Sequence, residues 1–246
     1  MPDTNYWRTD RPDEGSSTAH ARADDPALPL RTLSPAAYEP GYPYPLVVLF
    51  HPKGGNEDHV LRVAPRMSGQ NFIFLSLRGP EPLGKRDDGR SGFGWNHPDG
   101  ADFLAEYTRL AVELTRRTYH IHSERVYLAG IGDGAAAAFQ AGLRMADRIA
   151  GVIALNGGLP RPANGNPVFR MKDARSLRVF LAHGRDHASY THSDAARDYR
   201  ALYAAGADVR QKGYAVGNTL HAHMLRDANR WIIGNVEREY DAYLLK

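Results

Sequence analysis

The sequence contains no cysteine, and this absence removes several kinds of chemistry at once. Disulfide bonds, thiolate metal ligands and cysteine nucleophiles are all excluded. Histidine remains as a metal ligand, but the eleven histidines are scattered and do not combine with acidic residues at metal-binding spacing. We therefore expect neither a metal ion nor another cofactor.

The sequence also lacks long apolar runs and clusters of charge of one sign. No stretch is long and apolar enough to span a bilayer, and residues 1–14 lack the basic start and apolar run of a secretory signal. These features predict a cytoplasmic protein without stable membrane insertion. The 31 basic and 28 acidic residues are dispersed along the chain. Binding to a phosphate backbone needs a Lys/Arg stripe, so we expect no nucleic-acid partner. The sequence does not indicate an oligomeric state.

What is present is a pattern of alternating strands and helices. Residues 1–30 have almost no apolar periodicity and predict a mobile tail, whereas residues 31–246 have the length of one domain. Apolar runs predict strands at residues 45–51, 71–77, 125–131, 151–157, 177–184 and 209–216. Amphipathic segments predict helices at residues 58–69, 102–119, 134–146, about 195–203 and 225–243. This order predicts a three-layer α/β sandwich with a mostly parallel sheet.

Two details of this pattern are also predictions. The Gly/Pro-rich residues 78–100 are expected to form a loop. The helix at residues 102–119 is expected to bury one stripe, formed by Phe103, Tyr107, Leu110, Ala111, Leu114 and Thr118.

The most informative segment is VYLAGIGDGAAAAF, residues 126–139, where a buried strand meets an alanine-rich helix. Gly132 stands at the centre of the turn between small residues, which is typical of the nucleophile elbow of an α/β-hydrolase. Glycines after a strand also suit nucleotide phosphates. A dinucleotide fingerprint, however, belongs to the first βαβ unit and has an acid about 20 residues further on. Here two βα units precede the motif and the next strand offers no acid, so the elbow is favoured.

At this motif the chain resembles the phospholipase/carboxylesterase family of the α/β-hydrolase fold. The segment VVLFHPKGGNEDH, residues 47–59, is similar to the strand and oxyanion loop of that family. The resemblance implies that the backbone N–H groups of Lys53 and Asp133 receive the substrate oxyanion. His51 in this loop and Trp95 in the later loop are candidate binding residues. An ordinary tight turn and ordinary surface packing are the simpler explanations for them.

The chain order of the family, nucleophile then acid then histidine, implies the other site residues. Asp186 is the implied orienting acid, although it lies one residue closer to the preceding His-Gly pair than the resemblance implies. An exposed turn aspartate is the alternative. His221 is the implied histidine and is preferred to His223, which falls inside the predicted closing helix.

The family usually has serine at the position of Gly132, and glycine has no hydroxyl to form an acyl-enzyme. The sequence therefore predicts a catalytically impaired pseudohydrolase that binds a small acyl-type ligand. Two active alternatives stay open: slow hydrolysis by water that His221 activates, or Asp133 as an unusual nucleophile. Moving the elbow by one residue would put Ile131 where a small residue is needed, and the Asp133 charge also suits a helix N-terminus. An engineered substitution in an ordinary esterase is a further alternative.

Overall fold

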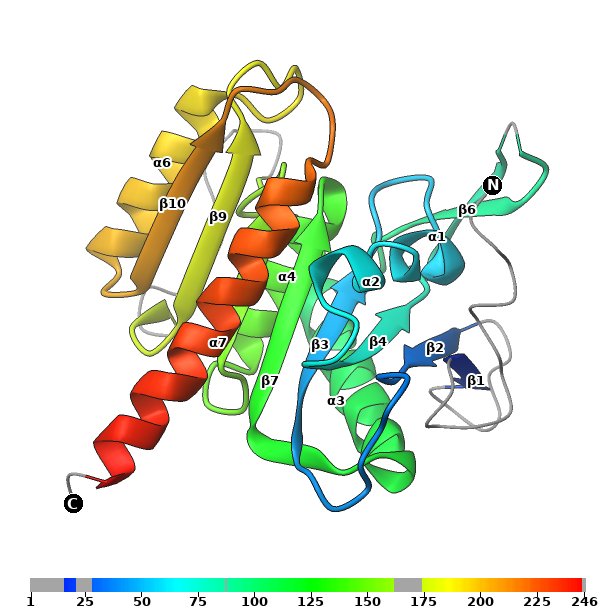
Figure 1. Ribbon diagram of the computed structural model, residues 1–246. Helices are drawn as coiled ribbons and strands as arrows, with labels where there is room; N and C mark the ends of the chain where they lie inside the picture. The colour runs from blue at the N-terminus through cyan, green and yellow to red at the C-terminus, as the bar shows by residue number, and fades with distance from the viewer. Residues whose placement is uncertain (1–15, 21–27, 87, 162–173, 245–246) are drawn as a thin grey trace.

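A computed structural model describes residues 16–20, 28–86, 88–161 and 174–244 around one central sheet. The sheet has eight strands in the order β1-β2-β4-β3-β7-β8-β9-β10 (Figure 1). The strands are β1 (Ser16–His20), β2 (Pro29–Leu33), β3 (Tyr44–Phe50), β4 (Ile73–Leu77), β7 (Ile121–Ile131), β8 (Gly151–Leu155), β9 (Arg178–Gly184) and β10 (Asp208–Tyr214). The β1–β2 and β2–β4 pairs are antiparallel and the others are parallel. The predicted mostly parallel sheet is confirmed.

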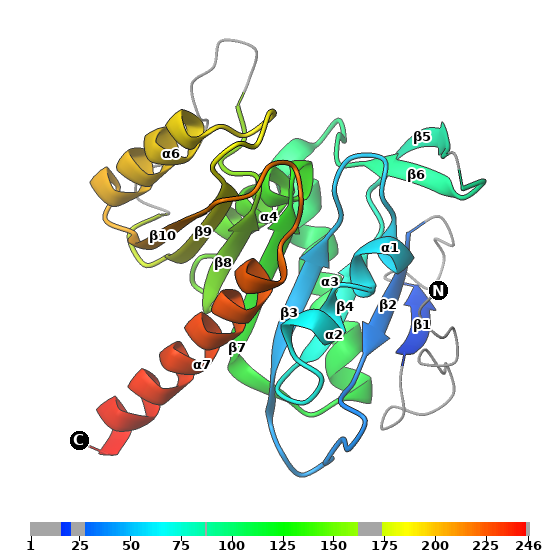
Figure 2. The ribbon, with the colours of Figure 1, turned by 45° about the horizontal axis from the view of Figure 1, so that its top comes forward.

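Helices cover both faces of this sheet. They are α1 (Glu57–Leu61), α2 (Ala64–Met67), α3 (Gly100–Thr118), α4 (Asp133–Arg144), α6 (His192–Ala204) and α7 (Ala222–Leu244). Helices α1, α2 and α7 pack on one face, and α3, α4 and α6 pack on the other (Figures 1 and 2). The predicted three-layer sandwich is confirmed.

The alternation of side chains along the central strands builds the two layers of the core. In β3, Leu46, Val48 and Phe50 pack toward α3 and α4, while Val47 and Leu49 pack toward α1, α2 and α7. All five side chains are buried. A strand with helices on both faces needs apolar residues at every position, which explains its continuous apolar run.

The buried stripe of α3 differs from the predicted one. Its buried residues are Leu104, Tyr107, Thr108, Ala111, Val112 and Thr115. Phe103 and Leu114 are only partly buried at the margin of the core. The two threonines tolerate burial because each hydroxyl donates to the carbonyl four residues earlier, at 2.6 and 2.7 Å. A threonine whose hydroxyl is bonded to its own helix can take the place of an apolar residue on the buried face.

The sheet begins earlier in the chain than predicted. β1 lies within the expected tail of residues 1–30, and β2 begins there too. β2 is held between β1 and β4, and it buries Leu30 and Leu33. Backbone pairing therefore orders sequence that has little apolar periodicity of its own. Residues 1–15 and 21–27 of the expected tail lie outside the described residues.

Two other segments also differ from the predictions. The helix expected at residues 58–69 is divided into α1 and α2, and Pro65 lies in the first turn of α2. Proline has no N–H to continue a preceding helix but suits the start of a new one. The loop expected at residues 78–100 contains a two-stranded hairpin, β5 (Glu81–Lys85) and β6 (Ser91–Gly94).

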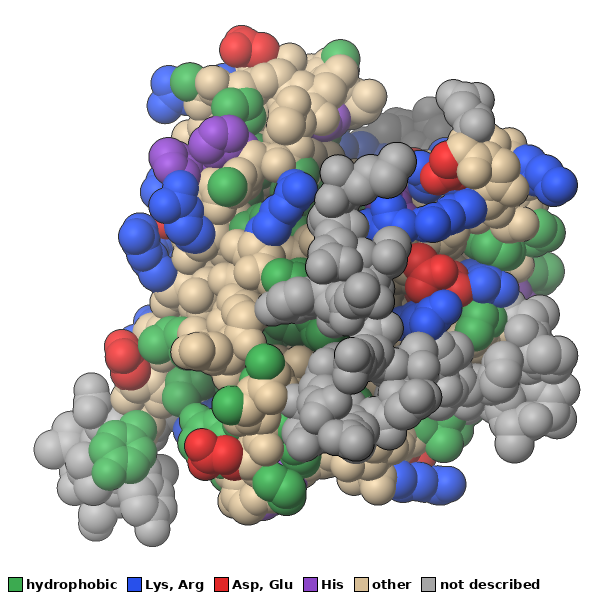
Figure 3. All heavy atoms as spheres, turned by 45° about the vertical axis from the view of Figure 1, so that its right-hand side comes forward, with side chains coloured by type: hydrophobic (Ala, Val, Ile, Leu, Met, Phe, Trp, Pro, Cys, Tyr) green, Lys and Arg blue, Asp and Glu red, His purple; other side chains and the backbone are tan. Residues whose placement is uncertain are grey.

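On the face drawn in Figure 3, Lys and Arg side chains lie in separate groups with acidic side chains among them. Within the described residues, no helix has the length and apolar character needed to cross a membrane.

Candidate functional site

The site is centred on the turn between β7 and α4, where Gly132 has φ 57° and ψ −124°. This conformation is rarely adopted by residues with a side chain. The N–H of Gly132 donates to Leu155 O on β8 at 2.9 Å, and its carbonyl accepts from Ala135 N at 3.0 Å. The turn therefore lies at the carboxyl ends of the parallel strands, where ligands bind in this class of fold.

The flanking glycines are required by close backbone contacts. A Cβ atom on Gly130 would lie 2.2 Å from the carbonyl oxygen of Gly134, and one on Gly134 would lie 2.3 Å from the carbonyl oxygen of Phe50. Gly132 is different, because a Cβ there would meet only Pro52 Cβ, at 3.6 Å. The elbow therefore has space for a side chain at its apex and none at its two sides.

The loop after β3 faces this apex and presents candidate donors. Pro52 lies against Gly132, and Lys53 follows it in a turn that the Gly55 N–H closes onto Pro52 O at 2.8 Å. Within the described residues, the backbone N–H groups of Lys53 and Asp133 have no backbone acceptor. Two open N–H groups beside an elbow are the arrangement that an oxyanion hole requires.

The buried His51 ring holds this loop in place through hydrogen bonds to the backbone. Its side chain is fully buried, Nδ1–H donates to Pro52 O at 2.9 Å, and Nε2 accepts from Gly79 N at 2.9 Å. Burial lowers the pKa of His51 to about 4, so the ring is neutral near pH 7. Trp95 packs on this ring at a centroid distance of 4.6 Å and donates its indole N–H to His51 O. Both ring nitrogens of His51 are therefore occupied by backbone groups.

A cavity of about 560 Å³ lies above the elbow. Its walls come from the loop after β3, hairpin β5–β6, the start of α4, and the loops that follow β8 and β9. Among the residues predicted from the sequence, Gly132, Lys53, Asp133 and Trp95 line it. His51, Asp186 and His221 are not among its lining residues.

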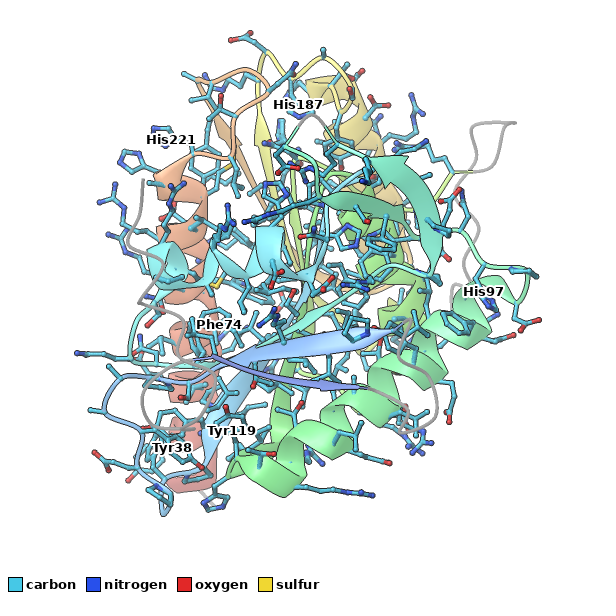
Figure 4. The ribbon with its side chains drawn as sticks, turned by 90° about the vertical axis from the view of Figure 1, so that its right-hand side faces the viewer. Tyr38, Phe74, His97, Tyr119, His187 and His221 are labelled. Atoms are coloured by element: carbon cyan, nitrogen blue, oxygen red, sulfur yellow. The ribbon has the colours of Figure 1, made fainter. Side chains whose placement is uncertain are left out.

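Asp186 and His221 lie apart from the elbow. The Asp186 side chain is exposed and makes no hydrogen bond or ion pair with any described residue. The His221 ring accepts at Nδ1 from the N–H of His223, at 3.2 Å, and contacts the His223 ring edge-on. In Figure 4 His221 points outward beside the start of α7, and His187 lies over the loops above the sheet. The structure therefore places no Asp186–His221 pair beside Gly132.

His187 is the histidine that lines the cavity with Gly132, and the sequence reasoning missed it. Burial lowers its pKa, and its Nδ1 accepts from the N–H of Tyr190 at 3.0 Å. The sequence did contain a signal for His187. Asp186 stands one residue closer to the His183–Gly184 pair than the resemblance implies for the site residue after this strand. The residue at the implied distance is His187.

One cavity wall is fixed by a buried carboxylate, Asp198 on α6. It accepts from the Leu159 N–H at 3.0 Å and the Tyr190 hydroxyl at 2.9 Å, and it pairs with the Arg161 guanidinium. Burial raises the pKa of Asp198, and these donors oppose that shift. The loops after β8 and β9 are thereby tied to one point on α6. Within the described part of the chain, no three His, Asp or Glu side chains are grouped as metal ligands.

Comparison with solved structures finds the same fold in carboxylesterases. The Bacillus cereus carboxylesterase aligns with a TM-score of 0.65 and 16% identity over 86% of this chain and 96% of that one. The Mesorhizobium loti carboxylesterase aligns with a TM-score of 0.65 and 17% identity over 86% and 97%. A ferulic acid esterase aligns with a TM-score of 0.65 and 15% identity over 89% and 98%.

Comparison with curated protein sequences finds no match. The model of the phospholipase/carboxylesterase family matches residues 41–233, which include β3 to β10, the elbow and the first half of α7. The chain therefore belongs to the phospholipase/carboxylesterase family.

Proposed function

We propose that the protein binds a small acyl-type ligand in the cavity above Gly132 and does not hydrolyse it through an acyl-enzyme. The observation that carries this proposal is the elbow itself. Its apex has a conformation with φ 57°, its flanks admit only glycine, and its apex residue has no nucleophilic atom. The two open N–H groups of Lys53 and Asp133 remain available to a carbonyl oxygen of the ligand.

The position of the histidines supports the same proposal. Serine catalysis needs a histidine that accepts the hydroxyl proton and a carboxylate that orients it. Neither Asp186 nor His221 lines the cavity. The absence of a hydroxyl on Gly132 and the positions of Asp186 and His221 outside the cavity lining both support binding without an acyl-enzyme.

A second candidate retains hydrolysis with Asp133 as the nucleophile. The observation in its favour is that Asp133 is exposed and lines the cavity beside Gly132. Against it, Asp133 is the first residue of α4, where a carboxylate stabilises the helix N-terminus without any catalytic role. Water activated by His221 has less support, because that ring lies outside the cavity lining.

The test is hydrolysis of p-nitrophenyl acetate and butyrate by the parent protein and three variants. We expect no turnover above background in the parent or in Asp133→Asn. Gly132→Ser should give measurable but slow turnover, because it supplies the hydroxyl that forms the acyl-enzyme, while neither Asp186 nor His221 lines the cavity to activate that hydroxyl. The double variant Gly132→Ser/His221→Ala tests the role that the sequence assigns to His221.

The outcomes separate the candidates. Parent turnover that Asp133→Asn abolishes would replace the proposal with the second candidate. Gly132→Ser turnover that needs His221 would show that this histidine reaches the elbow in solution. A folded but inactive Gly132→Ser variant would indicate that the whole catalytic apparatus is lost and that binding alone remains.

A further inference from the structure

Most polar side chains that wall the cavity are already bonded within the protein. The Trp95 indole N–H is bonded to His51 O, and the Tyr190 hydroxyl is bonded to Asp198. The side-chain amide of Asn156 accepts from one backbone N–H and donates to one backbone carbonyl, at 2.9 and 3.2 Å. These groups shape the cavity but have little capacity left for a ligand.

The lining side chains of Lys53, Asp133, Gln140 and Ser189 have no partner among the described residues. His187 differs from them because its ring is fixed at one nitrogen and open at the other. The Tyr190 N–H is the donor to Nδ1, so Nδ1 carries no proton and the neutral ring carries its proton on Nε2. Nε2 has no hydrogen-bond partner among the described residues. The ring is half-buried in the cavity wall, which accounts for its lowered pKa.

Protonation of this ring is also opposed locally. A proton on Nδ1 would direct a second N–H at the Tyr190 N–H, and that hydrogen bond would be lost. The Tyr190 backbone is held in place because its hydroxyl is bonded to the fully buried Asp198 carboxylate. The fold therefore fixes His187 as a neutral donor.

We propose that the Nε2–H of His187 is the hydrogen-bond donor that orients a neutral ligand by an ester, amide or hydroxyl oxygen in this cavity. This inference rests on the proposed function and deepens it. His187 then serves binding and not general-base catalysis, because a ring that holds its proton on Nε2 has no lone pair to offer there. Its exposed neighbour Asp186 makes no side-chain hydrogen bond or ion pair with a described residue that would reverse this tautomer.

The experiment is ¹⁵N NMR of the histidine rings at pH 7, with phenyl acetate as the probe ligand. His51 and His120 provide internal references, because each donates Nδ1–H to a backbone carbonyl and so has the opposite tautomer. We expect His187 to show the Nε2–H tautomer and to shift on addition of phenyl acetate. The Trp95 indole signal, which reports on the cavity wall, should shift with it, and the His120 signal should stay unchanged.

The matching variant is His187→Phe, which keeps an aromatic ring and removes the donor. One lost neutral hydrogen bond should weaken phenyl acetate binding about 10-fold. His120→Phe, an exposed substitution away from the cavity, is the control and should bind as the parent does. Circular dichroism checks that both variants fold, and the tautomer measurement on the parent needs no variant.

Three results would overturn the inference. One is a His187 ring that is charged or has its proton on Nδ1 at pH 7. Another is a shift of the Trp95 signal with phenyl acetate while His187 stays unchanged. The third is unaltered affinity in a folded His187→Phe variant. If no cavity signal responds to phenyl acetate at all, the proposed function fails together with the inference, and this outcome is distinct from the others.

Discussion

At the scale of single residues, Gly132 changes the energetics of the elbow as well as its chemistry. A residue with a side chain at φ 57° and ψ −124° stores strain on the order of 1–3 kcal/mol. Glycine adopts this conformation without a Cβ clash, so the turn forms without a side chain at its apex. Retention of the turn is therefore no evidence of retained catalysis, because the close backbone contacts of Gly130 and Gly134 hold it independently.

The buried ring of His51 predicts a pH-dependent part of the stability. The folded protein keeps this ring neutral down to about pH 4, whereas the unfolded chain takes up the proton near pH 6.5. Below pH 6.5 the unfolded state binds more protons, so the stability that the neutral ring contributes is lost as the pH falls toward 4. The loss should reach about 3 kcal/mol at most.

The measurement is urea unfolding of the parent and of His51→Gln at pH 7, 5.5 and 4.5. The parent should be the more stable at pH 7, and the difference between the two proteins should shrink as the pH falls. The other histidines with lowered pKa values are present in both proteins and cancel in the difference. Parallel pH profiles for the two proteins would contradict this prediction.

At the scale of elements, the cavity depends on how two loops are tied to α6. Asp198 bonds Leu159 in the loop after β8 and Tyr190 in the loop after β9. It also pairs with Arg161, whose side chain is 21% exposed while that of Asp198 is fully buried. Removal of one partner from a buried pair leaves an uncompensated charge.

We therefore expect Asp198→Ala to lower the free energy of unfolding by about 3–5 kcal/mol. Tyr190→Phe removes only one hydrogen bond to this carboxylate and should cost about 1.5–3 kcal/mol. The control is Asp102→Ala, which breaks an exposed ion pair with Arg144 and should cost less than about 1 kcal/mol. Urea unfolding measures all three. Equal costs for Asp198→Ala and Asp102→Ala would contradict the role given to Asp198.

At the scale of the whole molecule, one end of the sheet is built by the two antiparallel strands from the N-terminal region. Among the described strands, β1 lies at the edge of the sheet and pairs with β2 alone, whereas β2 also pairs with β4 and buries Leu30 and Leu33. Deletion of residues 1–20 should leave a folded protein with a small loss of stability. Deletion of residues 1–33 also removes three buried leucines, including Leu28, worth about 2 kcal/mol each.

The longer deletion should therefore be strongly destabilised or insoluble, and circular dichroism with urea unfolding measures both. If the longer deletion were as stable as the shorter one, the packing of β2 against the core would be refuted. Collapse of the shorter deletion would show that β1 contributes more than edge pairing.

The sequence by itself determined the class of fold, the order of most elements, and the position of the elbow. These properties depend on local patterns: continuous apolar runs for strands buried on both faces, and small residues where a strand meets a helix. The resemblance drawn from the elbow and oxyanion segments is confirmed by the family match. Strands β1 and β2, hairpin β5–β6 and the rotated stripe of α3 were missed, because backbone pairing and the bonding of the threonine hydroxyls leave no apolar periodicity in the sequence.

Only the tertiary structure decided which polar residues meet at the cavity. Chain order places Asp186 and His221 after the elbow, but it cannot say where loop side chains point. In the structure His187 lines the cavity, while Asp186 lies exposed and His221 bonds to its own helix start. The physical reason is that a one-residue difference in a turn redirects a side chain. The His187 ring is bonded to the N–H of Tyr190 in the same loop, and Tyr190 is in turn bonded to Asp198 of α6, a contact that forms only when α6 packs beside this loop.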